Sequence, residues 1–497
     1  MERVISVEVM RHSDAMTIQN NIPSKELMYR AGEAIFGAYE WKGKTAIICG
    51  SGNNAGDGYV LASLLQKAEI PCSVILLFDK FSADGRYYFE KCKEIGVEIL
   101  PYTSKFDFSS YTEIVDCIFG TGFSGEVTGI CKDAIEQINR SEKFVISVDI
   151  NSGLNGNNGL GSCCVKADLT LSIGYYQYGH FLGNAKDAMK KKQNLDIGID
   201  LYGESAYLAR AEAFCDVLKD RAQASHKGIY GYVALIGGCR EYSGAVKLAN
   251  MSCAALRSGC GVATLAVPDS ILNSVTPYLL ESTAFGLPDC DGHMRFDPVA
   301  LDRLLQNKSA VAIGMGWGKS AENARILAYL LQNYDLPTVI DADGLNTLAE
   351  MDQAVLKTTK CKVLLTPHLK EFSRLSGYTM EEIANDPIGT ARSYAKQYGV
   401  CLLLKGACTV VTDGDEVILV DRGCAGMATA GSGDVLSGIL VGLLGYSSVT
   451  TITAACGAYI AGLAGELAQS EENEISMIAS DTVRCISKAI AQIKKYF

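Results

Sequence analysis

The residues best suited to chemistry lie at 426–434, where the sequence reads GMATAGSGD. An apolar run follows immediately, so we expect the small residues to open a helix with the N–H groups of Gly431, Ser432 and Gly433 pointing outward. Such amides can hold nucleotide phosphates and stabilise a phosphoryl group in transfer. Asp434, in the first helical turn, is placed to take a proton from an attacking hydroxyl. The alternative is a helix start built of small residues for close packing, which leaves the acid unexplained.

Three further polar loops lie in the first half of the chain. Residues 50–58 read GSGNNAGDG, residues 116–125 read DCIFGTGFSG and residues 149–154 read DINSGL. Each follows a predicted strand, so the loops should gather at the carboxyl edge of one parallel sheet, where open α/β sheets bind ligands. A glycine-rich strand-to-helix turn also lets the backbone approach a phosphate. The alternative is three unrelated glycine turns.

The elements that position these loops form two α/β series. Continuous apolar strands separated by amphipathic segments predict a parallel sheet covered on both faces. In the first half we expect strands at 45–49, 73–78, 114–119, 144–149 and 169–173, and helices at 58–68, 87–95 and 132–139. In the second half we expect strands at 232–236, 262–267, 310–313, 338–340 and 363–365, a helix at 244–258, and a hairpin at 409–420 with a two-residue Asp413-Gly414 turn.

The chain of 497 residues is too long for one ordinary core. The α/β pattern loosens between residues 200 and 223, where polar and small residues separate the two series. We therefore predict a first domain at 1–210, a linker at 211–221 and a second domain at 222–497.

Bulk composition excludes several classes of protein. A net charge of −11 argues against non-specific nucleic-acid binding, which needs clustered Lys and Arg. The start of the sequence shows no signal core, and the apolar run at 436–444 is too short for a bilayer, so we expect a cytoplasmic protein without a membrane anchor. The 18 cysteines have no C-x-x-C spacing and most lie in apolar runs. We expect buried reduced thiols rather than a zinc site or a disulfide framework.

The first half resembles the NAD(P)H-hydrate epimerase family, which shares the order GxGNNxGDG, FGTG and SVDIxSGL. The likeness covers roughly residues 1–210 and implies a Rossmann-like parallel-sheet sandwich. It implies a potassium ion with side-chain ligands from Asn54, Asp116 and Ser152, all hard oxygen donors. It also implies a site for the hydrated nucleotides NADHX and NADPHX, lined by Asn53, Asn54, Gly56, Asp57, Gly120, Thr121, Gly122, Phe123, Gly125 and Asp149.

Asp149 is the best acid/base candidate of this half, because it ends an apolar strand where partial desolvation can tune a carboxylate. A loop cap or an ion ligand is the alternative reading. The chain departs from the family pattern twice, with Asn151 in place of a usual Pro and Gln177 in place of a common Lys. The second departure removes a cation from the segment before His180.

The second half resembles the ADP- or ATP-dependent NAD(P)H-hydrate dehydratase branch of the ribokinase-like superfamily. Besides GSGD, the shared segments are HKG at 226–228, GG at 237–238 with SGA at 243–245, GMGWG at 314–318, DADGLN at 341–346, TPHLKE at 366–371 and LKGA at 404–407. The likeness spans roughly 222–497 and implies a ribokinase-like α/β/α domain. Substrate contacts would come from Ala245, Gly316, His368 and Asp434, and nucleotide contacts from Lys405, Gly406, Ala407, Thr409, Gly431, Ser432 and Gly433.

Some of these positions have a second reading. His368 beside Pro367 is a common structural arrangement, and only its TPHxxE context favours a substrate contact. Asp341 and Asp343 would orient substrate or a magnesium ion, or else cap the turn before Gly344. Cys239 stands where the family usually has Ser, which removes one hydroxyl contact.

The two resemblances together imply a repair enzyme for hydrated NADH and NADPH. The first half would interconvert the R and S hydrates, and the second would dehydrate the S form with ADP or ATP through a phosphorylated intermediate. We expect a homo-oligomer that binds only these small molecules. The alternative is a vitamin or sugar kinase of the same superfamily with a non-catalytic N-terminal binding module.

Overall fold

The computed structural model describes residues 1–254 and 257–497. The chain forms two compact units, one of residues 3–206 and one of residues 207–497 together with residues 1–2. Both units are built around a parallel sheet with helices on both faces, so the predicted α/β class with two domains is confirmed. The domain bounds 1–210 and 222–497 stay a prediction.

The N-terminal unit is organised by a seven-stranded sheet in the order β4-β3-β2-β5-β6-β7-β9, parallel throughout. Its central strands are apolar and buried on both faces, as a covered parallel sheet requires. The strands are β2 (Thr45–Cys49), β3 (Cys72–Leu76), β4 (Glu98–Pro101), β5 (Glu113–Cys117), β6 (Phe144–Val148), β7 (Leu169–Ile173) and β9 (Lys192–Leu195).

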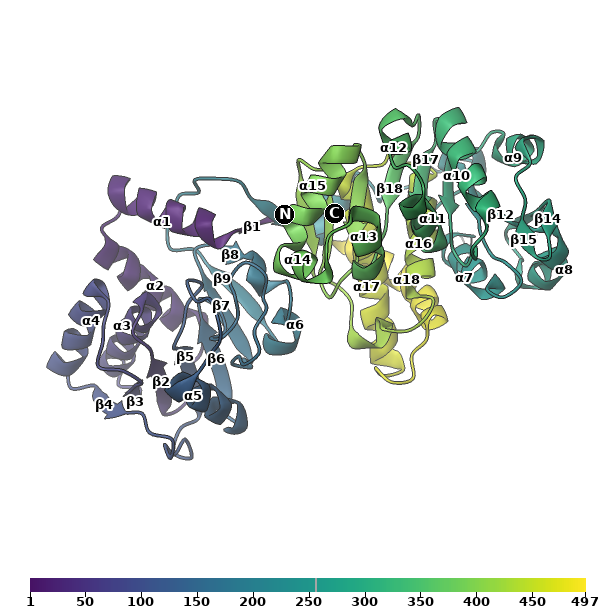
Figure 1. The fold of residues 1–497 in the computed structure, drawn as a ribbon. Coiled ribbons are helices and arrows are strands. Elements are labelled where there is room, and N and C mark those ends of the chain that lie inside the picture. The colour runs from purple at the N-terminus through teal and green to yellow at the C-terminus, as the bar shows by residue number, and fades with distance from the viewer. Residues whose placement is uncertain (255–256) are drawn as a thin grey trace. The chain divides into compact units, whose positions relative to one another are not determined.

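Helices cover the two faces of this sheet separately (Figure 1). One apolar core packs α2, α3 and α4 against alternate strand residues, and another packs α5 against the opposite set. The helices of this unit are α1 (Val7–Asn20), α2 (Ser24–Ala38), α3 (Asn53–Lys67), α4 (Ala83–Glu94), α5 (Gly129–Arg140) and the short α6 (Ala185–Ala188). A small parallel pair, β1 (Glu2–Ile5) with β8 (Tyr176–Gln177), lies beside α1.

The sheet of the C-terminal unit has the strand order β13-β12-β11-β16-β17-β18-β19-β20-β21-β10. It is parallel from β13 to β19 and antiparallel at β19-β20-β21. The strands are β10 (Ala206–Leu208), β11 (Tyr232–Ile236), β12 (Val262–Pro268), β13 (Thr283–Leu287), β16 (Ala310–Ile313), β17 (Pro337–Ile340), β18 (Lys362–Leu365), β19 (Cys401–Leu404), β20 (Thr409–Thr412) and β21 (Val417–Val420), with a separate hairpin of β14 (Asp289–Cys290) and β15 (His293–Met294).

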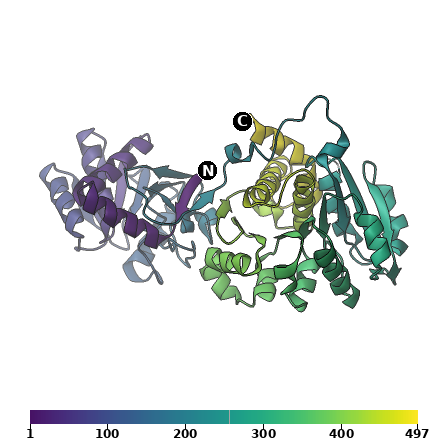
Figure 2. The ribbon, with the colours of Figure 1, turned by 90° about the horizontal axis from the view of Figure 1, so that it is seen from above.

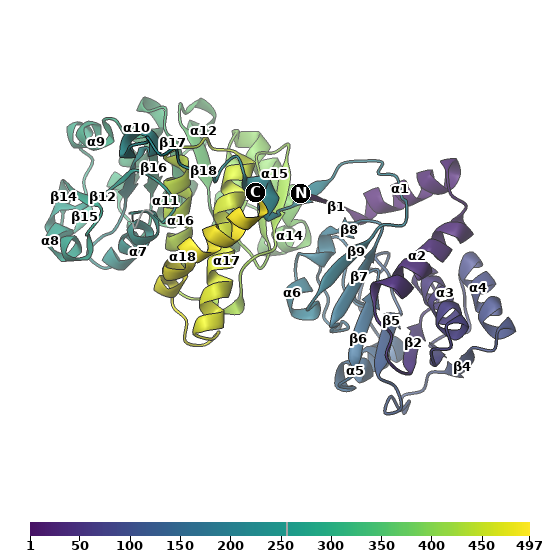
Figure 3. The same cartoon turned by 180° about the vertical axis from the view of Figure 1, so that it is seen from behind.

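Figure 2 shows this sheet between two groups of helices. One group, α7 (Ser243–Ala254), α16 (Ser432–Leu444), α17 (Thr451–Glu471) and α18 (Ala479–Ile493), shares the main apolar core with the strands, and Figure 3 shows α17 beside α18. The remaining helices are α8 (Leu272–Val275), α9 (Pro298–Leu305), α10 (Ala321–Asn333), α11 (Asp343–Glu350), α12 (Val355–Thr358), α13 (Leu369–Ser376), α14 (Met380–Asn385) and α15 (Pro387–Tyr398).

Within the described chain, α17 is the one helix long and apolar enough to cross a membrane by length and composition. Of its most apolar window, 83% is buried inside the C-terminal unit. Such burial is typical of a core helix.

Three comparisons between the structure and the sequence predictions bear on how the second unit is built. The linker at 211–221 stays a prediction; four apolar side chains spaced along it (Ala211, Phe214, Val217 and Leu218) are buried in the C-terminal core. The predicted two-residue turn at Asp413-Gly414 is a four-residue connection, since Thr412 pairs with Val417. The predicted helix at 244–258 is described only to Ala254, and residues 255 and 256 lie outside the described residues.

Candidate functional site

Three loops at the carboxyl edge of the N-terminal sheet line a cavity of about 500 Å³. They follow β2, β5 and β6, the strands at the centre of the sheet, because parallel strands end at one edge. Most of the predicted epimerase-site residues line this cavity: Asn53, Asn54, Asp57, Gly120, Thr121, Gly122, Phe123 and Asp149. Gly56 and Gly125 do not. Gly56 instead lets α3 pack against Met28 of α2, and Gly125 lies in an exposed turn with a φ of +95°.

Asp149 is held in place at the end of β6 by its neighbours on both sides. One carboxylate oxygen accepts the Thr121 N–H at 2.7 Å, and the ring of His180 donates to the Asp149 carbonyl at 2.7 Å. The backbone of Asp149 is left-handed, with a φ of +66°, which such fixed partners can sustain. Burial raises the pKa of Asp149, and the nearby Asp14 adds to the effect. A carboxyl group that binds a proton more readily is suited to acid/base work.

Asp57 and Asp14 face the same cavity as Asp149. Burial raises the pKa of Asp57 well above its ordinary value, and repulsion from the other two carboxylates adds to it. Arg11 of α1 lines the cavity as well, and its guanidinium donates to the Gly122 carbonyl at 3.4 Å. With Asp84, which also lines the cavity, the site gathers four acids and one cation.

An oxygen-rich cluster lies beneath the cavity at the predicted cation ligands. The buried carboxylate of Asp116 accepts the N–H of Ser152 at 2.9 Å and its hydroxyl at 2.6 Å. The amide nitrogen of Asn54 donates to the carbonyls of Phe119 at 2.8 Å and Val148 at 3.2 Å, while its oxygen is buried without a partner. Five oxygen-bearing residues thus converge here. If the Asn54 side-chain amide were flipped, its oxygen would face the carbonyl oxygens of Phe119 and Val148. A cation would stabilise three oxygens that face one another in this way.

The two residues that depart from the family pattern do not line the cavity. Asn151 is buried, and its amide donates to the carbonyls of Val165 and Ala188 at 2.9 and 2.8 Å. Gln177 is also buried and donates to the Tyr175 carbonyl at 2.7 Å. Both side chains stabilise loops behind the site.

In the C-terminal unit, Asp434 lies in the first turn of α16. Gly431, with a φ of +94°, forms the N-cap, and Ser432 and Gly433 follow as the first helical residues. The side chain of Asp434 is partly exposed and accepts no hydrogen bond within the described chain. Burial raises the pKa of Asp434 to about 7, with repulsion from Asp341 adding and attraction to Lys405 opposing.

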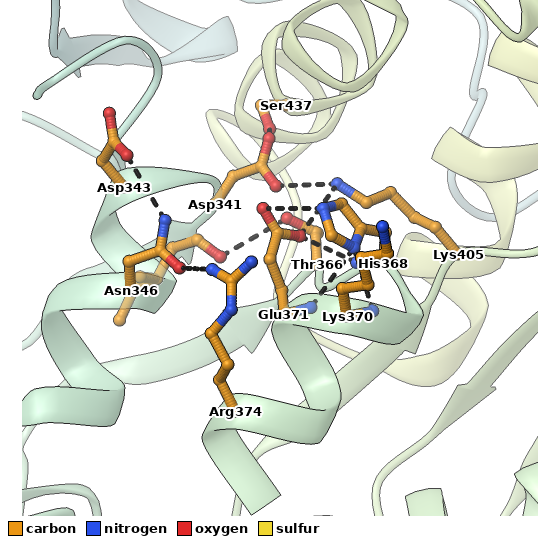
Figure 4. A network of polar contacts seen from close by, with 11 residues as sticks. Asp341, Asp343, Asn346, Thr366, His368, Lys370, Glu371, Arg374, Lys405 and Ser437 are labelled. Carbon is orange, nitrogen blue, oxygen red and sulfur yellow. Dashed lines mark hydrogen bonds and ion pairs between the residues drawn. The ribbon is translucent and has the colours of Figure 1, made fainter. Parts of the chain in front are cut away.

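A buried ion pair lies beside this helix start (Figure 4). The ammonium of Lys405 donates to Asp341 at 2.9 Å, and the other Asp341 oxygen accepts the Ser437 hydroxyl of α16 at 2.7 Å. Burial opposes the charge of Lys405, but Asp341, Glu371 and Asp434 raise its pKa, so it stays a cation. A Cβ at Gly433 would lie 3.4 Å from the Lys405 ammonium. The glycine therefore brings backbone N–H groups close to this charge.

His368 caps α13 through a reciprocal pair of contacts. Its ring accepts the N–H groups of Lys370 at 3.1 Å and Glu371 at 3.2 Å, and Glu371 accepts the His368 N–H at 2.8 Å. This is a capping box with His in place of Ser or Thr. The ring is half exposed, and its second nitrogen lies 3.5 Å from a carboxylate oxygen of Glu371.

Gly316 and Ala245 lie together at the start of α7. Gly316 has a φ of +58°, and a Cβ there would meet the Tyr242 carbonyl at 2.4 Å and the Ala245 Cβ at 2.8 Å. Asp343 fixes the same loop by accepting the Gly318 N–H at 2.8 Å. The predicted nucleotide contacts Gly406 and Ala407 are exposed in the loop after β19, and Thr409 begins β20.

Two protein families match the two halves of the chain separately. Residues 24–179 match the family described as YjeF-related protein N-terminus, and residues 233–488 match the family described as NAD(P)H-hydrate dehydratase. The chain is 35% identical to the bifunctional NAD(P)H-hydrate repair enzyme of Moorella thermoacetica, over 93% of this chain and 91% of that relative. The chain belongs to the bifunctional NAD(P)H-hydrate repair enzymes.

Solved structures confirm the fold expected for the second half of this repair enzyme. A ribokinase-like superfamily protein from Enterococcus faecalis superposes with a TM-score of 0.51 at 24% identity, covering 60% of this chain and 98% of that one. The ADP/ATP-dependent NAD(P)H-hydrate dehydratase of Bacillus subtilis, co-crystallised with ATP/Mg2+, gives a TM-score of 0.50 at 24% identity, covering 58% and 99%.

Sequence reasoning missed several residues of the two repair sites. Arg11 and Asp14 reach the first cavity from α1, which precedes every glycine loop and carries no motif. Glu371 stands inside the TPHLKE motif and Ser437 three residues after GSGD, but nothing in their spacing indicated that they contact Lys405 and Asp341. The pattern T-P-H-x-x-E did carry a signal, since an acid three residues after an N-cap indicates a capping box.

Proposed function

We propose that this chain repairs NADHX and NADPHX in two reactions. The N-terminal unit interconverts the R and S hydrates, and the C-terminal unit dehydrates the S form while consuming ADP or ATP. The observation that carries the proposal is Asp434 at the start of α16, with a pKa raised to about 7 by burial, beside the charged Lys405. The ATP/Mg2+ of the Bacillus subtilis relative supports a nucleotide as co-substrate.

The dehydration proceeds by phosphorylation followed by elimination. Asp434 takes the proton of the C6 hydroxyl as its oxygen attacks the terminal phosphorus of the nucleotide. The N–H groups of Gly431, Ser432 and Gly433, together with Lys405, stabilise the charge on the phosphoryl group. The ring nitrogen then expels inorganic phosphate, which leaves with the C–O electron pair, and loss of a ring proton regenerates the dihydronicotinamide.

Substrate and nucleotide approach this site from different loops. Gly316 and Ala245 line one side, where their lack of bulk lets a ring approach the backbone, and His368 offers the half-exposed edge of its imidazole, which lies beside the Glu371 carboxylate. Gly406, Ala407 and Thr409 offer main-chain contacts to the nucleotide on the loop after β19. In this reading Asp341 positions Lys405 rather than touching substrate.

Asp341 and Asp343 do not make a ready magnesium site. Asp341 is already bonded to an ammonium and a hydroxyl, and Asp343 to the Gly318 N–H and Asn346. A divalent cation bound to Asp341 would lie close to the positive charge of Lys405 and be repelled by it. We therefore assign no step to a magnesium ion held by the protein.

In the N-terminal unit Asp149 transfers the proton of the epimerisation. One oxygen is fixed by the Thr121 N–H, so the other is available to take up and return a proton. Burial raises the pKa of Asp149, which makes its protonated state more accessible than that of an exposed aspartate. Arg11 supplies the cation that the Gln177 departure removes elsewhere.

The oxygen cluster at Asn54, Asp116 and Ser152 fits a potassium ion. The orphaned Asn54 oxygen and the two carbonyls that face its amide are hard donors of the kind an alkali cation binds. A bound cation would offset the charge of Asp116, whose pKa burial raises. The cytoplasmic location and the homo-oligomer stay predictions.

One assay on the wild-type chain tests the proposal. Mixed NADHX epimers are incubated with ADP or ATP, and each epimer and NADH are followed by chromatography. Repair predicts loss of both epimers, with the R form faster than in buffer alone, and recovery of NADH absorbance. A stable phosphorylated product without NADH would instead indicate the small-molecule kinase.

A further inference from the structure

Three metal-ligating side chains meet at one end of the C-terminal sheet, outside the residues assigned above. Cys239 follows β11, Glu241 lies two residues further on, and His293 begins β15 in the hairpin. One ligand atom from each lies within 4.8 Å of the other two. It is the one such cluster of His, Cys, Asp and Glu found among the described residues.

His293 has a buried nitrogen that no hydrogen bond explains. Its Nε2 lies 3.6 Å from a carboxylate oxygen of Glu241, while its Nδ1 is buried and has no partner in the described chain. Leaving such a group unpaired costs about 1–3 kcal/mol. A partner for this nitrogen is therefore missing from the residues that the structure describes.

The backbone after Cys239 directs polar groups at its sulfur. The N–H groups of Glu241 and Tyr242 point at this atom. A metal ion bound at the sulfur would take the place of the thiol proton.

Space between the sulfur and the imidazole is kept open by a glycine. A Cβ at Gly318 would lie 3.1 Å from the Cys239 sulfur and 3.3 Å from His293 Nδ1. Gly318 also has a φ of +68°, which disfavours any side chain. The loop thus approaches both ligands without filling the room beside them.

We propose that Cys239, Glu241 and His293 bind one zinc ion, with a fourth position open to water. Thiolate, imidazole and carboxylate together suit zinc rather than magnesium or calcium, which take oxygen ligands alone. Ligand atoms of a tetrahedral zinc site lie about 3.5 Å apart, so small side-chain rotations bring these three into range. Sequence spacing predicts no zinc site because one ligand comes from a hairpin 52 residues away from Glu241 (293 − 241).

The zinc site would stiffen a loop that serves the proposed dehydratase reaction. Residues 237–242 carry two of the ligands, and the Tyr242 carbonyl at the end of this loop is where Gly316 packs. Binding of zinc does not depend on that reaction. The test therefore uses binding and stability rather than turnover.

Cobalt(II), a coloured substitute for zinc, tests the site in the full-length reduced protein under anaerobic conditions. We expect one equivalent to produce a sulfur-to-cobalt absorption band in the near ultraviolet, and zinc to displace it. Cys239→Ser should abolish the band. His293→Ala should weaken binding about tenfold or more. Cys215→Ser, at an exposed thiol elsewhere in the chain, is the matched control and should bind like wild type.

Thermal melting supplies a second readout. Zinc should raise the Tm of wild type and of Cys215→Ser by mass action, and should not raise that of Cys239→Ser or His293→Ala. The Tm of each metal-free variant shows whether it folds. A band or a zinc-induced shift that persists in folded Cys239→Ser would overturn the site, as would a wild-type protein that binds no cobalt. If neither ligand variant folds, Glu241→Gln, at an exposed ligand, must weaken cobalt binding for the site to stand.

Discussion

The two carboxylates proposed for the two reactions are prepared in different ways. Asp149 is fixed by a backbone N–H, a strained φ and the His180 ring, which has its own pKa lowered to about 4 by burial and so remains a neutral donor. Asp434 accepts no hydrogen bond in the described chain and is shaped by the charges around it. The first depends on local geometry and the second on electrostatics.

The pH dependence of the dehydratase reaction should report Asp434. Its pKa is raised to about 7, and only the ionised form can accept the hydroxyl proton, so kcat/KM should fall about tenfold per pH unit below 7. Asp341→Asn removes the repulsive neighbour and should move the inflection to lower pH. Stopped assays from pH 5 to 9 measure both profiles. An inflection that stays in place in Asp341→Asn would contradict this assignment.

Replacing Asp434 should make the protein more stable while it stops turnover. An aspartate with a folded pKa above its unfolded value disfavours the folded state at pH values above both, and this cost disappears below the unfolded value near 4. Asp434→Asn should therefore raise the free energy of unfolding at pH 8 by an amount on the order of a kcal/mol or more, with a matching rise in Tm, and change both little near pH 4. Calorimetry at both pH values checks this. A lower Tm at pH 8 would mean that the carboxylate is structural.

Residue types in motifs predicted the centre of each site but not its surroundings. Asp149 and Asp434 were identifiable because each ends a strand or opens a helix within a glycine-rich pattern. Arg11 was not, since it reaches the cavity from a helix whose position depends on tertiary packing. The same limit applies to His293, which a β-hairpin brings next to Cys239.

At the scale of elements, strands were easier to predict than loops. Thr45–Cys49, Leu169–Ile173 and Tyr232–Ile236 have the expected bounds, because buried parallel strands are continuous apolar runs. The helix after β2 begins at Asn53 rather than Gly58. Glycine has a low helix propensity, so Gly56 and Gly58 made the first turn look like a loop in the sequence. The four-residue turn after Thr412 shows that an Asp-Gly pair alone does not fix the length of a hairpin loop.

The loop after β5 should tolerate no side chain at its first glycine. A Cβ at Gly120 would lie 2.5 Å from the Asp149 carboxylate and displace it, so Gly120→Ala should lower the epimerisation rate about 100-fold. Gly52→Ala is the matched control, because this glycine lines the same cavity with open space around it. Chromatography of single epimers measures the rates. Equal epimerisation rates in the two variants would show that the reaction does not depend on the position of the Asp149 carboxylate.

The start of α13 allows the two roles of His368 to be separated. Asparagine is a good N-cap and alanine a poor one, so His368→Ala should lose about 1 kcal/mol of stability and His368→Asn much less. If the ring also contacts the hydrate, both variants should raise KM for the S form. Urea unfolding and steady-state kinetics provide the two measurements. Unchanged kinetics in His368→Asn would leave His368 as a cap only.

At the scale of the molecule, each unit holds a sheet and a core of its own, together with the residues proposed for its site. The α/β class and the two-domain architecture were predictable from the repeated alternation of strands and helices. The burial of residues 211–221 was not predictable, because their four buried apolar side chains are spread among polar ones and produce no clear period. Two self-contained units imply that the intermediate S hydrate can pass through solvent.

Complementation between two variants tests that account most directly. Asp149→Asn should dehydrate the S hydrate and convert R no faster than buffer does, while Asp434→Asn should interconvert R and S and form no NADH. Mixed in one vessel with R hydrate and nucleotide, the two proteins should restore NADH production to a rate near that of wild type. Failure of the mixture, with each variant active in its remaining half, would contradict two independent sites that exchange substrate. NADH production by Asp434→Asn alone would contradict the phosphoryl-transfer site itself.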